Sequence, residues 1–223
     1  MKKLLFVIAV ILLSLRCGTG NYHKLQTGDL VFVGIPQDRN AADTSLDAAI
    51  SVAIAGKDVS LTYIHTAIVE VANDSVFIID ATLKHGVDRH PLDTFLTDFT
   101  LSNGEHPVFL IKRVKGVDAA AAVERAKTYC GRKYDERYLP DNEDVYCTEL
   151  AQYSFLDKNG EKVFRNAPMN FRAPDGSMPG YWVWLFGQLG MDVPQAVLGT
   201  NPELLLQSKL LKTVDVNLVD YVK

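Results

Sequence analysis

Cysteine is scarce in this chain, with three among 223 residues: Cys17, Cys130 and Cys147. Cys17 follows an apolar N-terminal run, so at most one disulfide can form in the remainder of the chain. In an exported domain Cys130 and Cys147 could form that bridge. Cys147 lies in "EDVYCTELAQYSF" (143–155), between a polar loop and a predicted helix. Cys147 could be a buried packing residue, half of a disulfide, a metal ligand or a nucleophile.

The chain also lacks a block of basic residues. Its 23 Lys and Arg against 27 Asp and Glu give a net charge of −4, and the loss of Lys2, Lys3 and Arg16 with residues 1–20 would make it −7. Nucleic-acid binding needs clustered Lys and Arg to contact phosphates. We therefore expect no nucleic-acid partner.

A long apolar run is present only at the N-terminus, from Leu4 to Leu13. The run is too short for a bilayer span, which needs about 20 apolar residues. A basic start, a short apolar stretch and small residues after it are typical of a secretory signal over residues 1–20. We therefore expect an exported protein in the periplasm or cell envelope.

Two routes of processing remain open at the end of this segment. Cys17 directly after the apolar run indicates a lipoprotein that is tethered to the membrane through the lipidated cysteine. Leu15 and Arg16 occupy positions where lipoprotein signals usually carry small residues, so ordinary cleavage near Gly18 or Gly20 is the alternative.

Repeats, low-complexity tracts and long linkers are absent, so residues 21–223 are predicted to form one domain. The pattern predicts strands at 28–34 and 107–115, a hairpin over 64–83, and helices at 43–56, at 118–131 and from Cys147 onward, with a short amphipathic stretch around 182–189. The hairpin turns at Asn73-Asp74 and has no room for a crossover helix. The order of elements indicates an α+β domain with an antiparallel sheet.

The position of Cys147 at a predicted helix start favours a reactive thiolate. A helix N-terminus and a neighbouring imidazole both favour the thiolate, which is the nucleophilic form. Cys130 lies instead at the end of an alanine-rich helix, beside Gly131, where the dipole disfavours an anion. We therefore interpret Cys130 as a small buried hydrophobic residue.

His65 is the one histidine of the five that begins a predicted strand. A lone strand histidine is more often a hydrogen-bonded structural residue than a catalytic one. The hairpin register changes this balance, because a two-residue turn at Asn73-Asp74 places Thr82 opposite His65. Asp80 then shares a face with His65, one diagonal step away and within reach. A three-residue turn would put the two on opposite faces.

Five motifs, taken in order, resemble one family of enzymes. "GDLVFV" (28–33), "HTAIVEV" (65–71), "VFIIDAT" (76–82), "GRKYD" (131–135) and "YCTEL" (146–150) are similar to segments of the YiiX/YebB-like proteins. These are circularly permuted relatives of the NlpC-type papain-like cysteine hydrolases, in which the His strand precedes the Cys. The later "YWVWLFGQLG" and "VLGTNP" resemble the family's C-terminal segment, so the likeness covers roughly residues 25 to 210.

The resemblance implies a permuted papain-like fold: a barrel-like antiparallel sheet with helices packed around it. It implies that Cys147 is the nucleophile, His65 the general base and Asp80, where the family commonly has Glu, the residue that orients His65. Tyr134 would line the site or help to hold an oxyanion, with a core aromatic as the alternative. Asp135, beside it, is a candidate contact for a substrate amine or an ordinary solvated acid.

The function expected from these residues is an exported cysteine hydrolase or acyltransferase acting on amide, peptide or ester links, without cofactor or metal. Its substrates would be a cell-wall peptide, an amino-acid amide or a lipid-linked molecule. The alternative is a catalytically idle envelope protein that binds wall fragments or lipid in the same cleft. A metal site at His85, Asp88 and His90 is a weaker hypothesis, because the spacing fits no familiar ligand pattern and the residues resemble a polar turn before Pro91.

Overall fold

The computed structural model describes residues 23–37, 44–54, 60–140 and 142–222. The signal segment predicted for residues 1–20, with Cys17, lies outside these residues. Within them, no helix combines the length and the apolar character that a membrane span requires.

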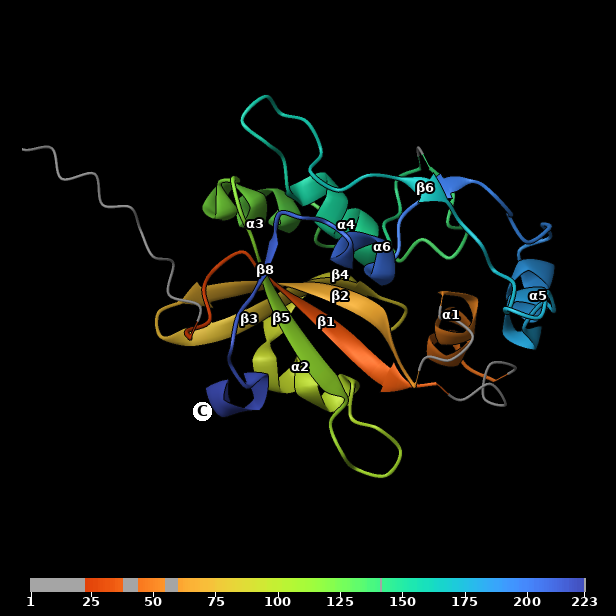
Figure 1. Ribbon diagram of the computed structural model, residues 1–223, viewed down its shortest axis with the longest axis horizontal. Coiled ribbons are helices and arrows are strands. Elements are labelled where there is room, and N and C mark those ends of the chain that lie inside the picture. Colours follow the sequence, from red (N-terminus) through yellow and green to blue (C-terminus); the bar gives the residue numbers. More distant parts are fainter. Residues whose placement is uncertain (1–22, 38–43, 55–59, 141, 223) are drawn as a thin grey trace, which may run out of the picture.

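A fully antiparallel, six-stranded sheet forms the centre of the molecule (Figure 1). Its order is β4-β3-β2-β1-β5-β8, and every neighbouring pair is antiparallel. The strands are β1 (Asp29–Pro36), β2 (Leu61–Ala72), β3 (Ser75–Thr82), β4 (Gly86–Pro91), β5 (Val108–Val114) and β8 (Leu211–Thr213). A separate two-stranded sheet joins β6 (Ala167–Pro168) to β7 (Leu198–Gly199). The predicted α+β class is confirmed, and the main sheet is open, with β4 and β8 at its edges.

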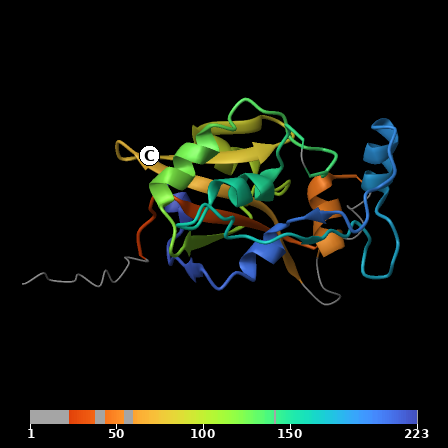
Figure 2. The same cartoon turned by 90° about the horizontal axis from the view of Figure 1, so that it is seen from above.

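Helices cover both faces of the main sheet. In Figure 1, α3, α4 and α6 lie on one face, α2 lies on the other, and α1 and α5 lie toward one end. Figure 2 shows α3 and α4 lying across the sheet. The helices are α1 (Leu46–Ile54), α2 (Leu92–Asp98), α3 (Ala119–Lys127), α4 (Cys147–Ser154), α5 (Gly180–Gln188) and α6 (Pro202–Leu206), followed by a 3₁₀ turn at Leu218–Tyr221.

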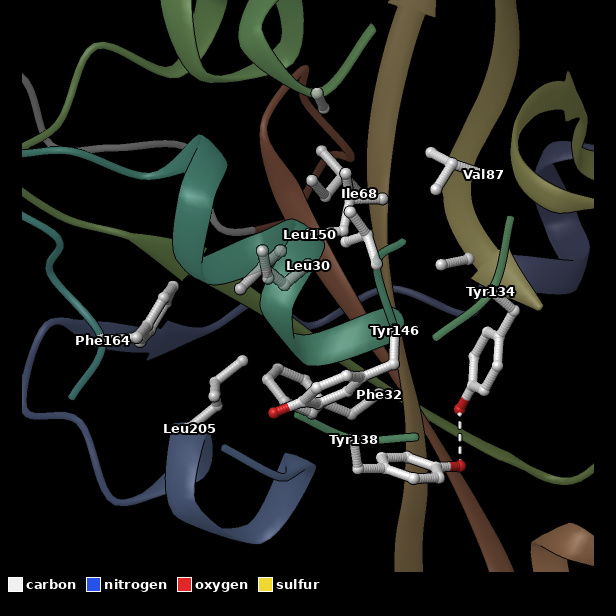
Figure 3. Close-up of a cluster of buried hydrophobic side chains, with 14 of the residues drawn as sticks. Leu30, Phe32, Ile68, Val87, Tyr134, Tyr138, Tyr146, Leu150, Phe164 and Leu205 are labelled. Atoms are coloured by element: carbon white, nitrogen blue, oxygen red, sulfur yellow. Dashed lines mark hydrogen bonds between the residues drawn. The ribbon is translucent and has the colours of Figure 1, made fainter. Parts of the chain in front are cut away.

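The sheet separates two hydrophobic clusters because side chains alternate along each strand. On β1, Leu30 and Phe32 join the cluster under α3 and α4, which Figure 3 shows around Leu150. Val31 and Val33 join the cluster that contains Phe95 of α2. The central strands are therefore buried on both faces, and their apolar runs are nearly continuous.

The hairpin of β2 and β3 has the predicted two-residue turn. Asn73 and Asp74 both have positive φ, at 50° and 59°, as in the turn type that matches strand twist. Ala72 pairs with Ser75, and the ladder runs in the same register to Ile68 and Ile79. This register places odd-numbered residues of β2 and even-numbered residues of β3 on one face, as predicted.

Several elements differ from the sequence-based expectation, and β4, α2 and β8 are those in or against the main sheet. Residues 86–91, interpreted as a polar turn, form β4, which pairs with β3 along its whole length. The helix α2 follows directly after Pro91, and β8 completes the far edge. Neither was predicted, because both are short and α2 has no side-chain cap at its N-terminus.

The interpretation of Cys130 as a buried residue is wrong. The helix α3 ends at Lys127, before Cys130, and the chain turns there with the Cys130 amide donating to the Lys127 carbonyl. The Cys130 side chain is exposed by this turn, whereas Cys147 is buried. Both thiols are free, so the possible disulfide between them is not formed.

Candidate active site

Cys147 is the first residue of α4, so its sulfur lies at the helix end where backbone N–H groups lack intrahelical partners. Glu149, in the same first turn, accepts a hydrogen bond from the Tyr146 amide at 3.5 Å and one from the Tyr153 hydroxyl at 3.0 Å. These bonds fix the start of the helix. Cys147 is 5% exposed and lines a small cavity.

His65 of β2 and Asp80 of β3 are in direct contact. The His65 Nε2 lies 2.8 Å from Asp80 Oδ2, and both side chains are buried. The ring is also close enough to Cys147 for the two side chains to interact electrostatically. Because Nε2 is engaged by Asp80, Nδ1 is the nitrogen left for the sulfur. The three predicted residues are thus brought together in the order Cys147, His65, Asp80.

The electrostatics of the group favour an imidazolium. Burial alone lowers the pKa of His65, but the charge of the Cys147 thiolate, hydrogen bonds to Asp80 and Cys147, and the charge of Asp80 raise it from 6.5 to about 10. An opposite charge within contact distance stabilises the charged form, and here two of them flank one ring. A thiolate beside a protonated imidazole is a nucleophile that is ready at neutral pH.

Both helical layers contribute to holding the His65 ring. Phe99, just after α2, lies 4.7 Å from it between ring centroids, and Phe95 of α2 lies 6.4 Å away. Cys147 approaches from α4, which lies on the other face of the sheet (Figure 1). The strand itself is irregular here, because the register between β1 and β2 shifts between Val33 and Gly34, opposite His65.

Tyr134 lies at the site and is joined to a second tyrosine. Its hydroxyl is 3.1 Å from the Tyr138 hydroxyl, and Figure 3 shows the two groups pointing toward one another. Burial raises the pKa of both phenols well above the ordinary value, so both stay protonated and can donate. Tyr138 has a φ of 53°, a conformation rare outside glycine, asparagine and aspartate. Backbone strain of this kind concentrates at functional sites.

Two cavities meet around these residues. One, of about 250 Å³, has polar lining groups that include His65, Asp47 and Lys84. The other, of about 50 Å³, contains Cys147 and is mostly apolar and aromatic. Tyr134, Ile50 and Ile64 line both. A substrate carbonyl at Cys147 would therefore have a polar space on the His65 side and a narrow apolar one on the other.

Asp135 does not face a substrate. Its carboxylate accepts hydrogen bonds from the amides of Arg137 and Leu139 and from the Asn142 side chain, and the residue is buried. These bonds close the loop that carries Tyr134 and Tyr138. Asp135 therefore has a structural role, and its proposed contact with a substrate amine is not supported.

The three residues of the metal hypothesis are divided among other contacts. His85 Nε2 bonds Asp98 Oδ2 at 2.7 Å, and His90 faces Asp80 and Asp88 at 3.7 and 3.9 Å. Among the residues that the structure describes, no group of three or more His, Cys, Asp or Glu side chains is arranged to hold a metal ion.

Sequence reasoning missed Tyr138 and Phe99, and it considered His90 only as a candidate metal ligand. Tyr138 lies in a stretch without periodicity, and its positive φ has no sequence signal in a tyrosine. Phe99 and His90 belong to α2 and β4 or their ends, which were not predicted.

Comparisons with known proteins identify the family and the fold. Residues 24–215 match the family model described as a permuted papain-like amidase enzyme, YaeF/YiiX, C92 family. The uncharacterized protein YiiX of Escherichia coli K12 is 22% identical over 193 residues, covering 85% of each chain. A crystal structure of YiiX from Escherichia coli O157:H7, described as a metalloprotein, superposes with a TM-score of 0.60 at 22% identity, over 85% of this chain and 96% of that one. The chain, with its histidine strand before its cysteine helix, belongs to the YaeF/YiiX family of permuted papain-like amidases, as the resemblance predicted.

Proposed function

We propose that this protein is a cysteine amidase that works through Cys147, His65 and Asp80. The observation that carries the proposal is the position of the His65 ring, which is hydrogen-bonded to Asp80 through Nε2 and interacts electrostatically with Cys147. A base that contacts both a nucleophile and a buried carboxylate has the arrangement that activates a thiol. Membership of an amidase family supports the same reaction class.

In the first half of the reaction the Cys147 thiolate attacks the carbonyl carbon of the amide, and a carbon–sulfur bond forms. The negative charge moves to the carbonyl oxygen, where free N–H groups at the start of α4 and the Tyr134 hydroxyl are the available donors. His65 then gives its proton to the amide nitrogen, the carbon–nitrogen bond breaks, and the amine leaves. A thioester with Cys147 remains.

In the second half His65, now neutral, takes a proton from water as the water oxygen attacks the thioester. The carbon–sulfur bond breaks, the acid product leaves, and the thiolate–imidazolium pair is restored. Asp80 holds the ring orientation throughout. A different acceptor in place of water would give acyl transfer or, with an ester substrate, transesterification from the same intermediate.

For the substrate we propose a small amide in the cell envelope, either a cell-wall peptide or a lipid-linked molecule. The predicted signal at residues 1–20 supports export, and Cys17 is the candidate for a lipid anchor. The apolar and aromatic lining around Cys147, which includes Tyr138, Phe171 and Trp182, supports an acyl or peptide group on that side.

The test is hydrolysis of a panel of peptide amides and N-acyl amino acids, with products identified by mass spectrometry. We expect release of acid and amine by the parent and by Cys130→Ala, and at least a 10³-fold loss in Cys147→Ala. Acid quenching during turnover should add the mass of the acyl group to the parent and to Cys130→Ala, but not to Cys147→Ala. Equal hydrolysis by Cys147→Ala, or no turnover of any amide by the parent, would reject the proposal in favour of another nucleophile or a binding role.

A further inference from the structure

Asp80 lies between two histidines that come from the strands on either side of it. On β4, His90 pairs with Ile78, two residues from Asp80 on β3, and so has the same face as Asp80. His65 reaches Asp80 from β2 by a similar diagonal step. The carboxylate thus has an imidazole from each neighbouring strand, and the account of catalysis above uses only one of them.

The Asp80 carboxylate and the His90 ring are complementary, because within the part of the chain that the structure describes one has a free acceptor atom and the other can donate a hydrogen bond. Asp80 is fully buried, and its Oδ2 is bonded to His65, but its Oδ1 has no direct hydrogen-bond partner among the described residues. His90 is also buried, and neither of its ring nitrogens has a direct partner in the same part of the chain. The distance from His90 Nε2 to Asp80 Oδ1 is 3.7 Å. Buried polar groups are paired in nearly all proteins, directly or through water.

The surroundings hold His90 in this orientation. Its ring stacks on Phe95 at an interplanar angle of 19°, and Phe95 also contacts His65. The other charged or titratable groups that face it are Asp88 of β4, 3.9 Å from Nδ1, and His85, whose ring centroid is 5.7 Å away and whose Nε2 is bonded to Asp98. Asp88 on the Nδ1 side leaves Nε2 as the nitrogen that faces the catalytic carboxylate.

We propose that His90 is a positioning residue for the proposed amidase reaction, donating from Nε2–H to Oδ1 of Asp80 directly after a small shift or through one water. A carboxylate on a short side chain can rotate about its terminal torsion unless both oxygens are held. With Oδ1 held by His90, Oδ2 remains directed at His65, which keeps the ring in place for Cys147. Residues that hydrogen-bond a catalytic side chain without contacting the substrate commonly fix the orientation of that side chain.

The proposal rests on the proposed function, so its test includes a readout that is independent of turnover. In the ¹⁵N-labelled parent we expect NMR to show a proton on His90 Nε2 and a downfield His65 Nε2–H resonance. A His90 with the proton on Nδ1 alone and a bare Nε2 would overturn the proposal, whether or not the protein hydrolyses amides.

Substitutions then test the consequence for the site. His90→Phe keeps a ring against Phe95 but removes the donor, and should lower kcat about tenfold with KM little changed while broadening the His65 resonance. His90→Gln keeps a donor and should restore both readouts in large part. The control is His106→Gln, at an exposed loop histidine outside the site.

Each outcome decides the question. A folded His90→Phe protein with parent kcat and an unchanged His65 resonance would overturn the proposal. If His90→Phe does not fold, the tautomer of His90 in the parent remains the deciding measurement. Absence of turnover in the parent together with the expected His90 Nε2 proton would reject the proposed function and leave the contact between His90 and Asp80 in place.

Discussion

The Asp80 carboxylate holds His65 by a single contact, 2.8 Å from Nε2 to Oδ2, inside a fully buried environment. Its contribution is therefore orientation and charge, whereas the imidazole itself moves the proton. The role of Asp80 can be replaced in part, because an asparagine amide can accept the same hydrogen bond through its oxygen, although it cannot supply the charge. The proton transfer by His65 has no such replacement. Substitutions at the two residues should have unequal effects.

We expect His65→Ala to lower kcat by about 10³-fold, since it removes general acid and base together. Asp80→Asn should lower it by only about tenfold, because the amide oxygen can still accept from Nε2–H. Steady-state kinetics on one amide substrate measures both, with Asp74→Asn in the exposed hairpin turn as the control. Equal losses in the two variants would mean that the Asp80 charge, rather than the orientation of the ring, is what the reaction needs.

The contact between His65 and Asp80 was predictable from the sequence, whereas their neighbours were not. The Asn73-Asp74 turn fixed the register, and register fixes which side chains share a face. The geometry agrees with that argument, and the catalytic roles stay predictions. Tyr138, Phe99 and His90 depend on backbone strain or on elements that short-range patterns do not specify. The exposure of Cys130 was missed because a helix end misplaced by three residues turns a side chain from the core to the solvent.

In the first turn of α4, the carboxyl group of Glu149 is buried, and its hydrogen bonds only partly offset the cost of burying its charge. Burial raises the pKa of Glu149 from 4.5 to about 7, and the nearby charge of Asp135 adds to the effect, against hydrogen bonds from Tyr153 and Tyr146. Between pH 4.5 and 7 the folded state therefore holds a proton that the unfolded state has lost. The free energy of unfolding must fall as the pH rises through this window.

Glu149→Gln should remove this dependence, because the amide does not titrate. Its single oxygen can keep only one of the two hydrogen bonds that the carboxylate accepts through separate oxygens, and that loss is the same at every pH. Relative to the parent, the variant should gain about 2 kcal/mol in free energy of unfolding between pH 5 and pH 8. Urea unfolding at the two pH values measures the difference. A constant difference between the proteins at both pH values would show that Glu149 does not carry the titration.

The elements that were predicted correctly have strong local signals. Asp118 caps α3 by accepting from the Ala121 amide at 3.0 Å, and the hairpin has its two turn residues in the left-handed region. The strand β4 and the helix α2 are specified mainly by what they pack against: β3 on one side and the cluster around Phe95 on the other. Tertiary contacts of this kind override weak local preference.

For the whole molecule, the central claim joins segments that lie far apart in the sequence. The histidine comes from β2 in the sheet and the cysteine from α4 in a helical layer, and the fold alone brings them into contact. The order of the motifs predicted the family and the α+β class. That the main sheet stays open between β4 and β8 was not predictable, since closure depends on strand pairing at the two edges.

The most direct test is the rate of iodoacetamide modification of Cys147 as a function of pH, followed by peptide mapping, in the parent and in His65→Ala. The pair holds the pKa of His65 at about 10, so the imidazolium should support a reactive thiolate throughout the neutral range. Partial desolvation by its neighbours and the charge of Asp88 instead raise the pKa of Cys130, whose thiol should react slowly in the neutral range.

We expect a limiting dose at pH 7 to modify Cys147 of the parent well before Cys130. In His65→Ala the rate at Cys147 should fall at least tenfold and its rise should move to higher pH, with the rate at Cys130 unchanged as the internal control. Modification of Cys130 first in the parent, or the same pH profile at Cys147 in both proteins, would contradict the thiolate–imidazolium pair and with it the assignment of this site as catalytic.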